Sequence, residues 1–329
     1  MDARAILFMA PRRVEVQSVP LPDLAAGDAL IRTSYSGISA GSEMLAYRGE
    51  IDPRVPLDET IGALGGTFRY PFRYGYSCVG RVESGDGALT EGDLVFAFHP
   101  HQDRFVVPIA DVIPLGDADE RIATLLPLVE TAVQLSRDAE VVDGDPVVVV
   151  GLGVVGLLTA ALLVRAGALV LASEPLVWRR AAALAFSVTA VAPEALEKAV
   201  RAETSGHGAK VLIEASGNPA ALASGLHLLA HEGTALVASW YGRNPVPLPL
   251  GAEFHRRRLS IRSSQVSTIP AAQQPDWTVH KRREFARALL DQLPLAELAT
   301  HRFAFDNAAD AFAAVDKGVN GLIHAALCY

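Results

Sequence analysis

The chain has 329 residues, of which half are hydrophobic and a fifth are charged, and its formal net charge is −8. This length exceeds what one hydrophobic core usually supports, so we expect two domains. The acidic balance argues against a nucleic-acid-binding protein, and two cysteines cannot build a disulfide framework or a four-thiolate zinc site. The N-terminal residues show no signal-peptide pattern, so we expect a cytoplasmic protein.

Residues 1–123 contain short runs of β-forming residues separated by proline and glycine. Runs of this kind between turn residues are typical of strands in a compact β-rich domain. The strands predicted in this region are Ala5–Met9, Asp28–Tyr35, Gly75–Glu83 and Asp93–Phe98.

Residues 124–266 have a different pattern, in which apolar strands alternate with helical stretches rich in alanine and leucine. This alternation predicts a parallel sheet with crossover helices. The apolar run over residues 146–172 is interrupted by glycines and an arginine, so we do not expect it to insert into a membrane. The predicted strands are Val147–Val150, Leu169–Ala172, Val211–Glu214, Ala235–Ala238 and Leu259–Ile261.

Residues 267–329 carry an amphipathic helix at about 280–293, a second helix near 307–317 and a short apolar strand, Leu322–Leu327. We expect this segment to return to the first domain. The predicted organisation is therefore α/β, with a β-rich domain built from residues 1–123 and 267–329 and a doubly wound parallel-sheet domain over 124–266.

The glycine-rich stretch Gly151–Gly156 follows a valine strand and opens a helix. In that context Gly151 permits a tight turn, Gly153 lets the backbone approach a pyrophosphate, and Gly156 lets helix and strand pack closely. Val154 and Val155 lie at the helix N-terminus, whose N–H groups attract phosphate. The pattern predicts a dinucleotide-binding loop.

Glu174 ends the next predicted strand, where an acidic residue usually accepts the ribose hydroxyls of the adenosine. A carboxylate there repels a 2′-phosphate, which favours NAD over NADP. Arg179 lies five residues later and partly offsets that effect. The plainer alternative makes Glu174 a carboxylate at the start of a helix.

Further cofactor-contacting candidates follow other predicted strands of the sheet, whose carboxyl ends would face a bound dinucleotide. Thr131, at the start of the helix leading into the glycine loop, is another candidate, although Glu130-Thr131 also reads as an ordinary helix start. The strand-end candidates are Ala215, Ser216, Gly217, Trp240, Tyr241 and Gln265.

The order of these parts resembles the medium-chain dehydrogenase/reductase superfamily over nearly the full chain. More narrowly, four stretches resemble the bacteriochlorophyllide a dehydrogenase branch. The resemblance implies a GroES-like catalytic domain and a Rossmann cofactor domain. The four stretches are Ser36–Glu43, Tyr74–Val82, Phe98–Gln102 and Phe254–Leu259.

Zinc-binding members of that superfamily have three catalytic ligands that this chain lacks. By the resemblance, Ser39 stands where a cysteine ligand is usual, Tyr76 replaces a histidine, and the third position falls near Pro127. We therefore expect no metal. A replacement site built from His99, His101 and Glu43 is the alternative, because all three are competent ligands.

Without a metal, a side chain must handle the hydroxyl proton. His99 is the first candidate, because the resemblance places it in the substrate pocket and its ordinary pKa suits acid/base chemistry. Tyr76 is the competing donor, or else a tyrosine packed against aromatic neighbours. Glu43 would orient His99 or accept a substrate hydroxyl, or else cap a turn. Ser39, His101 and Trp240 complete the expected substrate pocket.

These features predict a metal-free, NAD(H)-dependent oxidoreductase that interconverts a secondary alcohol and a ketone. By the resemblance, the substrate is a fairly large secondary metabolite or a tetrapyrrole. The alternatives are an NADPH-dependent reductase of a conjugated C=C bond and a non-catalytic dinucleotide-binding sensor. Relatives often dimerise through their central sheets, so we expect a homodimer that pairs the strand near 259–264.

Overall fold

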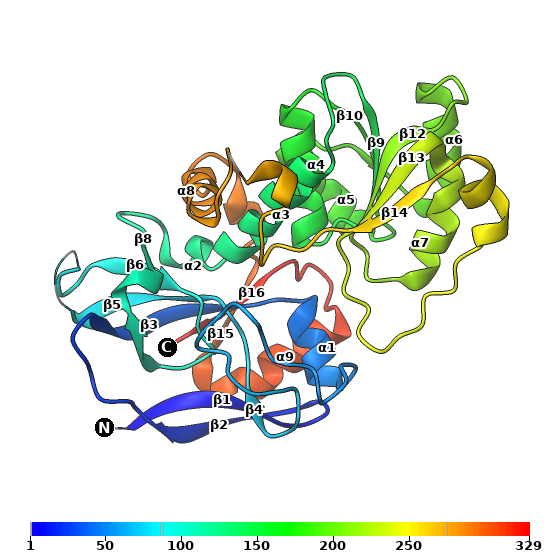
Figure 1. Cartoon of the computed structure of the whole chain (residues 1–329). Helices are drawn as coiled ribbons and strands as arrows, with labels where there is room; N and C mark the ends of the chain where they lie inside the picture. Colours follow the sequence, from blue (N-terminus) through cyan, green and yellow to red (C-terminus); the bar gives the residue numbers. More distant parts are fainter. Residues whose placement is uncertain (1, 86, 88, 275) are drawn as a thin grey trace. The chain divides into compact units, whose positions relative to one another are not determined.

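The computed structural model describes residues 2–85, 87, 89–274 and 276–329. The chain forms two compact units, one running up to Pro127 and including Leu298–Tyr329, and the other spanning Leu128–Glu297. Each unit is coloured along the sequence in Figure 1. Across the described part of the chain, no helix combines the length and the apolar character that a membrane span requires.

The first unit is β-rich. One sheet has the strand order β2-β1-β4, and a seven-stranded sheet has the order β15-β16-β3-β5-β6-β8, with β7 also pairing with β3. Its strands are β1 (Asp2–Ala10), β2 (Arg13–Pro20), β3 (Asp28–Ile38), β4 (Phe72–Arg73), β5 (Cys78–Ser84), β6 (Leu94–Ala97), β7 (Arg104–Pro108), β8 (Val112–Pro114), β15 (His301–Ala304) and β16 (Ala325–Cys328). Its helices are α1 (Ser42–Arg48), α2 (Glu120–Ala123) and α9 (Ala308–Lys317).

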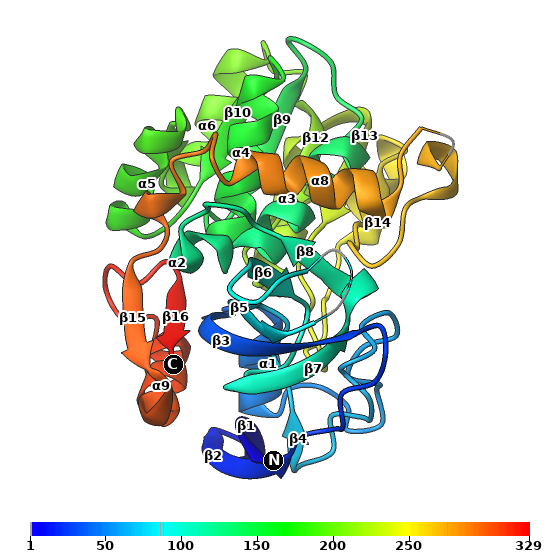
Figure 2. The ribbon, with the colours of Figure 1, turned by 90° about the vertical axis from the view of Figure 1, so that its left-hand side faces the viewer.

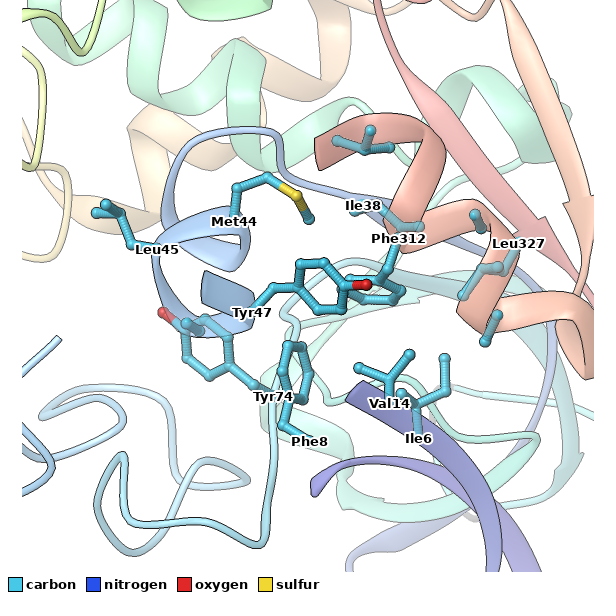
Figure 3. Packing of buried hydrophobic residues seen from close by; sticks show 14 of the residues in the cluster. Ile6, Phe8, Val14, Ile38, Met44, Leu45, Tyr47, Tyr74, Phe312 and Leu327 are labelled. Carbon is cyan, nitrogen blue, oxygen red and sulfur yellow. The ribbon is translucent and has the colours of Figure 1, made fainter. Parts of the chain in front are cut away.

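An aromatic cluster joins the two ends of the chain in this unit. Phe8 of β1 stacks on Phe72 with ring centroids 5.1 Å apart and meets Phe312 of α9 edge-on at 5.3 Å. Figure 3 shows Phe8, Tyr47 and Phe312 converging from three separate segments. Because buried aromatic pairs add to the free energy of apolar burial, this cluster explains why the C-terminal segment returns to the N-terminal strands.

The second unit contains a six-stranded parallel sheet with the order β11-β10-β9-β12-β13-β14. Its strands are β9 (Pro146–Val150), β10 (Leu169–Ser173), β11 (Ala190–Val191), β12 (Ala209–Glu214), β13 (Leu229–Val237) and β14 (Ser260–Ser263). Its helices are α3 (Leu126–Asp138, which begins in the first unit), α4 (Val154–Arg165), α5 (Val177–Ala183), α6 (Pro193–Glu203), α7 (Pro219–Gly225) and α8 (Val279–Leu289).

The sheet order reverses between β9 and β12, as in dinucleotide-binding sheets, where ligands bind outside the carboxyl ends of the strands at that point. The central strand β9 is a run of valines because a strand covered on both faces needs apolar residues at every position. The predicted fold class, a Rossmann-type sheet with a β-rich domain, is confirmed.

The segment 267–297 lies with the second unit, whereas the sequence analysis expected it in the first. Arg282 of α8 explains the difference. This fully buried side chain donates from Nε to Glu130 of α3 at 2.9 Å and from Nη1 to Gln134 at 2.8 Å. Figure 2 shows α8 running beside α3. An amphipathic pattern identifies such a helix but not the unit that it covers.

Candidate functional site

The glycine loop of the second unit is shaped by two close approaches. Gly151 has φ +90°, and a Cβ there would lie 2.5 Å from Ser216 Cα. A Cβ on Gly156 would lie 2.0 Å from the carbonyl oxygen of Gly151. A Cβ on Gly153, in contrast, would meet nothing within 4 Å. The fold itself therefore requires the first and third glycines, while the second borders open space.

Helix α4 begins directly after this open space. Its N-cap is Gly153, which provides no side-chain cap. The first N–H groups of a helix, here including those of Val154 and Val155, have no partner within the helix and carry the positive end of its dipole. This end of α4 can therefore hold an anionic group such as a pyrophosphate.

Glu174 follows β10 and is 2% exposed. One carboxylate oxygen accepts a hydrogen bond from the Leu152 backbone N–H at 2.9 Å, and the other accepts from the Leu176 N–H at 3.0 Å. Arg179 Nη1 lies 3.8 Å from Oε2. Glu174 thus links the glycine loop to the segment that follows β10. Each of its carboxylate oxygens keeps a second lone pair, which can accept a hydrogen bond from a ribose hydroxyl.

The loops after β12 and β13 form a second polar group in this unit. Tyr241 donates its hydroxyl to the buried Glu214 carboxylate, which also accepts from the Ser216 N–H at 2.8 Å. Gly217 N–H donates to Ser239 Oγ at 2.9 Å. Burial, together with the Glu214 carboxylate, raises the pKa of Tyr241 well above its ordinary value. The predicted strand-end residues therefore join two neighbouring loops of the sheet.

Other cofactor candidates occupy more varied positions. Ala215 lies beside Gly156, since a Cβ built on that glycine would be 3.1 Å from the Ala215 Cβ. Trp240 is 42% exposed. Gln265 is exposed and its side chain bonds to Ser267 in its own loop, while Thr131 is half-buried on α3. Gln265 therefore binds its own loop here.

In the first unit, Glu43 and His101 form a buried pair. His101 Nε2 lies 2.8 Å from Glu43 Oε2, and both side chains are 0% exposed. The other carboxylate oxygen accepts from the Ser39 backbone N–H at 2.8 Å. His101 Nδ1 lies 2.7 Å from Ser36 Oγ, which in turn lies 2.9 Å from the Tyr329 hydroxyl.

This network revises two of the predicted roles. Glu43 was expected to orient His99, to accept a substrate hydroxyl or to cap a turn, and His101 to line the substrate pocket, but Glu43 bonds to His101, both are enclosed, and both imidazole nitrogens of His101 are engaged. Their geometry fits a positioning role for the turn at Ser39. The sequence analysis missed Ser36 and Tyr329 in this network.

The side chain of His99 has other partners than Glu43 and His101. Its ring stacks on Phe105 with centroids 4.0 Å apart and 12° between planes, and Nδ1 donates to the Pro100 carbonyl at 2.9 Å. The second ring nitrogen therefore carries a lone pair. Burial lowers the pKa of His99 to about 3. His99 is thus neutral near pH 7, which argues against the predicted role as a protonated acid.

Tyr76 is half-buried and its ring meets Tyr74 edge-on at 6.2 Å, so the expected aromatic packing is present. Burial, followed by the charge of Glu43, raises the pKa of Tyr76 to about 12, while hydrogen bonds with the Ser39 and Ser42 side chains act in the opposite direction. Its hydroxyl therefore stays protonated near pH 7 within a group of three hydroxyls. Such a group can donate a hydrogen bond to a substrate oxygen.

The sequence of the chain is similar to those of known dehydrogenases. A family model described as zinc-binding dehydrogenase matches residues 154–279. The chain is 28% identical to 2-desacetyl-2-hydroxyethyl bacteriochlorophyllide A dehydrogenase of Cereibacter sphaeroides, over 95% of this chain and 94% of the relative. It is 25% identical to 5-exo-hydroxycamphor dehydrogenase of Pseudomonas putida, over 96% of each.

Among solved structures, the fold is similar to that of a short chain alcohol dehydrogenase from Escherichia coli CFT073 complexed with NADH. The TM-score is 0.78 at 17% identity, over 100% of this chain and 99% of the other. The sheet order, the glycine loop and the full-length relatives agree. These findings support the medium-chain dehydrogenase/reductase superfamily for this chain, whose fold is similar to that of alcohol dehydrogenases with a GroES-like and a Rossmann-type domain.

Proposed function

We propose that the protein is an NAD(H)-dependent dehydrogenase that interconverts a secondary alcohol and a ketone. The observation that carries this proposal is the loop Gly151–Gly156, in which two glycines are required by the fold and Gly153 borders open space at a helix N-terminus. Similar proteins named as dehydrogenases of hydroxyethyl and hydroxycamphor substrates support the alcohol chemistry and a fairly large substrate.

The residues of the second unit would hold the cofactor. Backbone N–H groups at Val154 and Val155 would bind the pyrophosphate, and Glu174 would accept the adenosine ribose hydroxyls. When bound, the nicotinamide supplies or accepts the hydride. The protein then has to position the substrate and move one proton.

Tyr76 is the proposed proton donor, because its hydroxyl lies with those of Ser39 and Ser42 in a hydrogen-bonded group. His99, being neutral, would accept a hydrogen bond through Nε2 and orient the substrate. Glu43, which accepts a hydrogen bond from the Ser39 N–H and is itself bonded to His101, would fix the turn at Ser39. This assignment favours Tyr76, the competing donor of the sequence analysis, over His99, its first candidate.

Zinc, which the matched family's description implies, does not fit these residues. Ser39 and Tyr76 offer hydroxyls instead of thiolate or imidazole ligands, and both nitrogens of His101 are already bonded. Within the described ranges, no three histidine, cysteine, aspartate or glutamate side chains gather as a metal site. We therefore propose proton handling by side chains alone.

The proposed dimer would use β14, which ends the strand order of the parallel sheet. An edge strand presents unpaired backbone groups that a second copy can satisfy. Size-exclusion chromatography with light scattering would measure the molar mass of the protein in solution, which should be twice that of one chain.

Cofactor choice is the first test. NADH is expected to bind at least about tenfold more tightly than NADPH, because the Glu174 carboxylate repels a 2′-phosphate. Fluorescence titration of the whole protein with each cofactor measures the ratio. Glu174→Gln should reduce the ratio, since it removes the charge and keeps an acceptor. A preference for NADPH would instead favour the reductase of a conjugated C=C bond.

A further inference from the structure

The loop that follows β14 in the second unit is held by one buried arginine. Arg282 of α8 is 1% exposed, and its Nη2 donates to the carbonyl oxygen of Val266, which lies in the loop that leaves this strand. Its other nitrogens donate to Glu130 and Gln134 of α3. One guanidinium group therefore joins α8, α3 and the loop, and none of the roles proposed for the cofactor or the proton uses it.

A second contact holds the beginning of the same loop. Ser264 Oγ donates to Asp138 Oδ2 at 2.6 Å, at the end of α3, and Asp138 is 4% exposed. The other oxygen of Asp138 accepts from the Gln134 side chain at 2.8 Å and from the Gln273 side chain at 3.1 Å. Because Gln134 also bonds to Arg282, the two contacts that hold the loop belong to one buried network.

This network restrains direction more than it adds stability. Replacing a buried ion pair by apolar residues of similar volume is often neutral or stabilising, so packing alone could hold α8 against α3 without the Arg282–Glu130 pair. Hydrogen bonds depend on direction, and a satisfied buried network makes the segments that it joins more rigid. The network therefore restrains where the Val266 carbonyl, and with it the loop, can lie.

The loop lies at the edge of the sheet where the proposed cofactor would bind. In the strand order, β10, which precedes Glu174, is on one side of β9, whereas β12, β13 and β14 follow one another on the other side. A dinucleotide with its adenosine at Glu174 and its pyrophosphate at α4 would extend its nicotinamide half over these three strand ends. The loop that Arg282 holds belongs to that half.

We propose that Arg282 is a positioning residue for the nicotinamide half of the cofactor and acts through the loop of residues 264–267. The inference rests on the proposed function, because it takes the dinucleotide to be the ligand. Arg282 is enclosed and acts by holding the Val266 carbonyl. Loss of this contact should weaken the binding of the nicotinamide half and leave the adenosine and pyrophosphate sites unchanged.

Two variants release the loop without leaving an unpaired buried charge. Arg282→Lys keeps a cation beside Glu130, but one ammonium nitrogen replaces three guanidinium nitrogens that reach separate acceptors. Glu130→Gln/Arg282→Gln removes both charges together. Arg283→Gln is the matched control, because this neighbouring arginine of α8 also pairs with Glu130, at 3.5 Å, and its side chain is 34% exposed.

The test compares two probes by calorimetric titration of the whole protein: NADH, and ADP-ribose, which is the dinucleotide without its nicotinamide. Both Arg282 variants should bind NADH at least about tenfold more weakly than the wild type, while their affinity for ADP-ribose changes less than about twofold. Arg283→Gln should bind both probes as the wild type does. In the cofactor-free Arg282 variants, peptides covering residues 264–274 should exchange their amide hydrogens at least about tenfold faster.

The positioning role is overturned if the Arg282 variants keep their NADH affinity, or if they lose affinity for both probes equally, because a general loss of structure weakens both. Unchanged exchange of the loop also overturns it, as does a wild type that binds NADH no more tightly than ADP-ribose. Failure of the proposed function has a different signature. In that case the wild type binds neither probe, and the dehydrogenase proposal falls together with this inference.

Discussion

His101→Ala is expected to lower the free energy of unfolding of the first unit by about 3–5 kcal/mol. The change leaves the Glu43 carboxylate, which is 0% exposed, without its partner, and an uncompensated buried charge has a cost of that order. It also frees Ser36 Oγ from its bond to His101 Nδ1. The effect is large because neither group can turn to solvent.

Tryptophan fluorescence cannot report this change, since Trp178, Trp240 and Trp277 all lie in the second unit. Hydrogen exchange followed by mass spectrometry can report the loss of stability in the first unit. Peptides covering β3 and α1 should exchange at least about 100-fold faster in the variant.

Glu43→Gln is the matched control, because an amide can still accept from the Ser39 N–H and bond to the imidazole. It should cost much less than His101→Ala. The Glu43→Leu/His101→Leu variant should also be milder than His101→Ala, because it removes both buried polar partners together. Exchange that changes less than about tenfold in His101→Ala would show that the pair does not carry this stability.

Tyr76→Phe is expected to lower kcat by about 10²–10⁴-fold, the usual contribution of a positioned proton donor. The variant removes only the hydroxyl and keeps the edge-on packing against Tyr74. NADH affinity should stay unchanged, because the glycine loop belongs to the other unit. A panel of secondary alcohols, monitored by NADH absorbance, supplies the assay.

His99→Phe is the companion variant, since a phenyl ring keeps the stack on Phe105. It should raise KM more than it lowers kcat. With the pKa of His99 lowered to about 3, kcat should also show no ionisation near pH 6.5 from this group. A chelator should leave every rate unchanged. If Tyr76→Phe keeps near-normal turnover and His99→Phe loses it, the two roles are reversed.

The second unit was predictable because its signals are local. A valine strand, a glycine turn and an apolar helix follow one another directly, so the residues that form the loop also identify it. The exception is α8. Its buried Arg282 reads in the sequence as part of a polar helix face, and nothing local shows that Glu130 lies opposite it.

The site of the first unit was predicted less well, because its contacts join distant residues. Glu43 and His101, 58 positions apart, were grouped as possible metal ligands, but the sequence does not show that they hydrogen-bond directly to each other. Tyr329 reaches Ser36 across 293 positions. The pKa of His99 depends on burial, which its surrounding sequence does not show. The sequence shows which residue types are present, whereas the burial of their side chains becomes visible only in the folded structure.

The central claim is that the glycine loop binds a nicotinamide dinucleotide, and NADH titration of the wild-type chain and of Gly153→Val tests it most directly. A Cβ on Gly153 would meet nothing within 4 Å beyond its chain neighbours, so the thermal midpoint should change little. The account predicts that the wild type binds one NADH per chain and that the variant binds at least about tenfold more weakly. Absence of NADH binding to the wild type, or equal affinity in the variant, would contradict it.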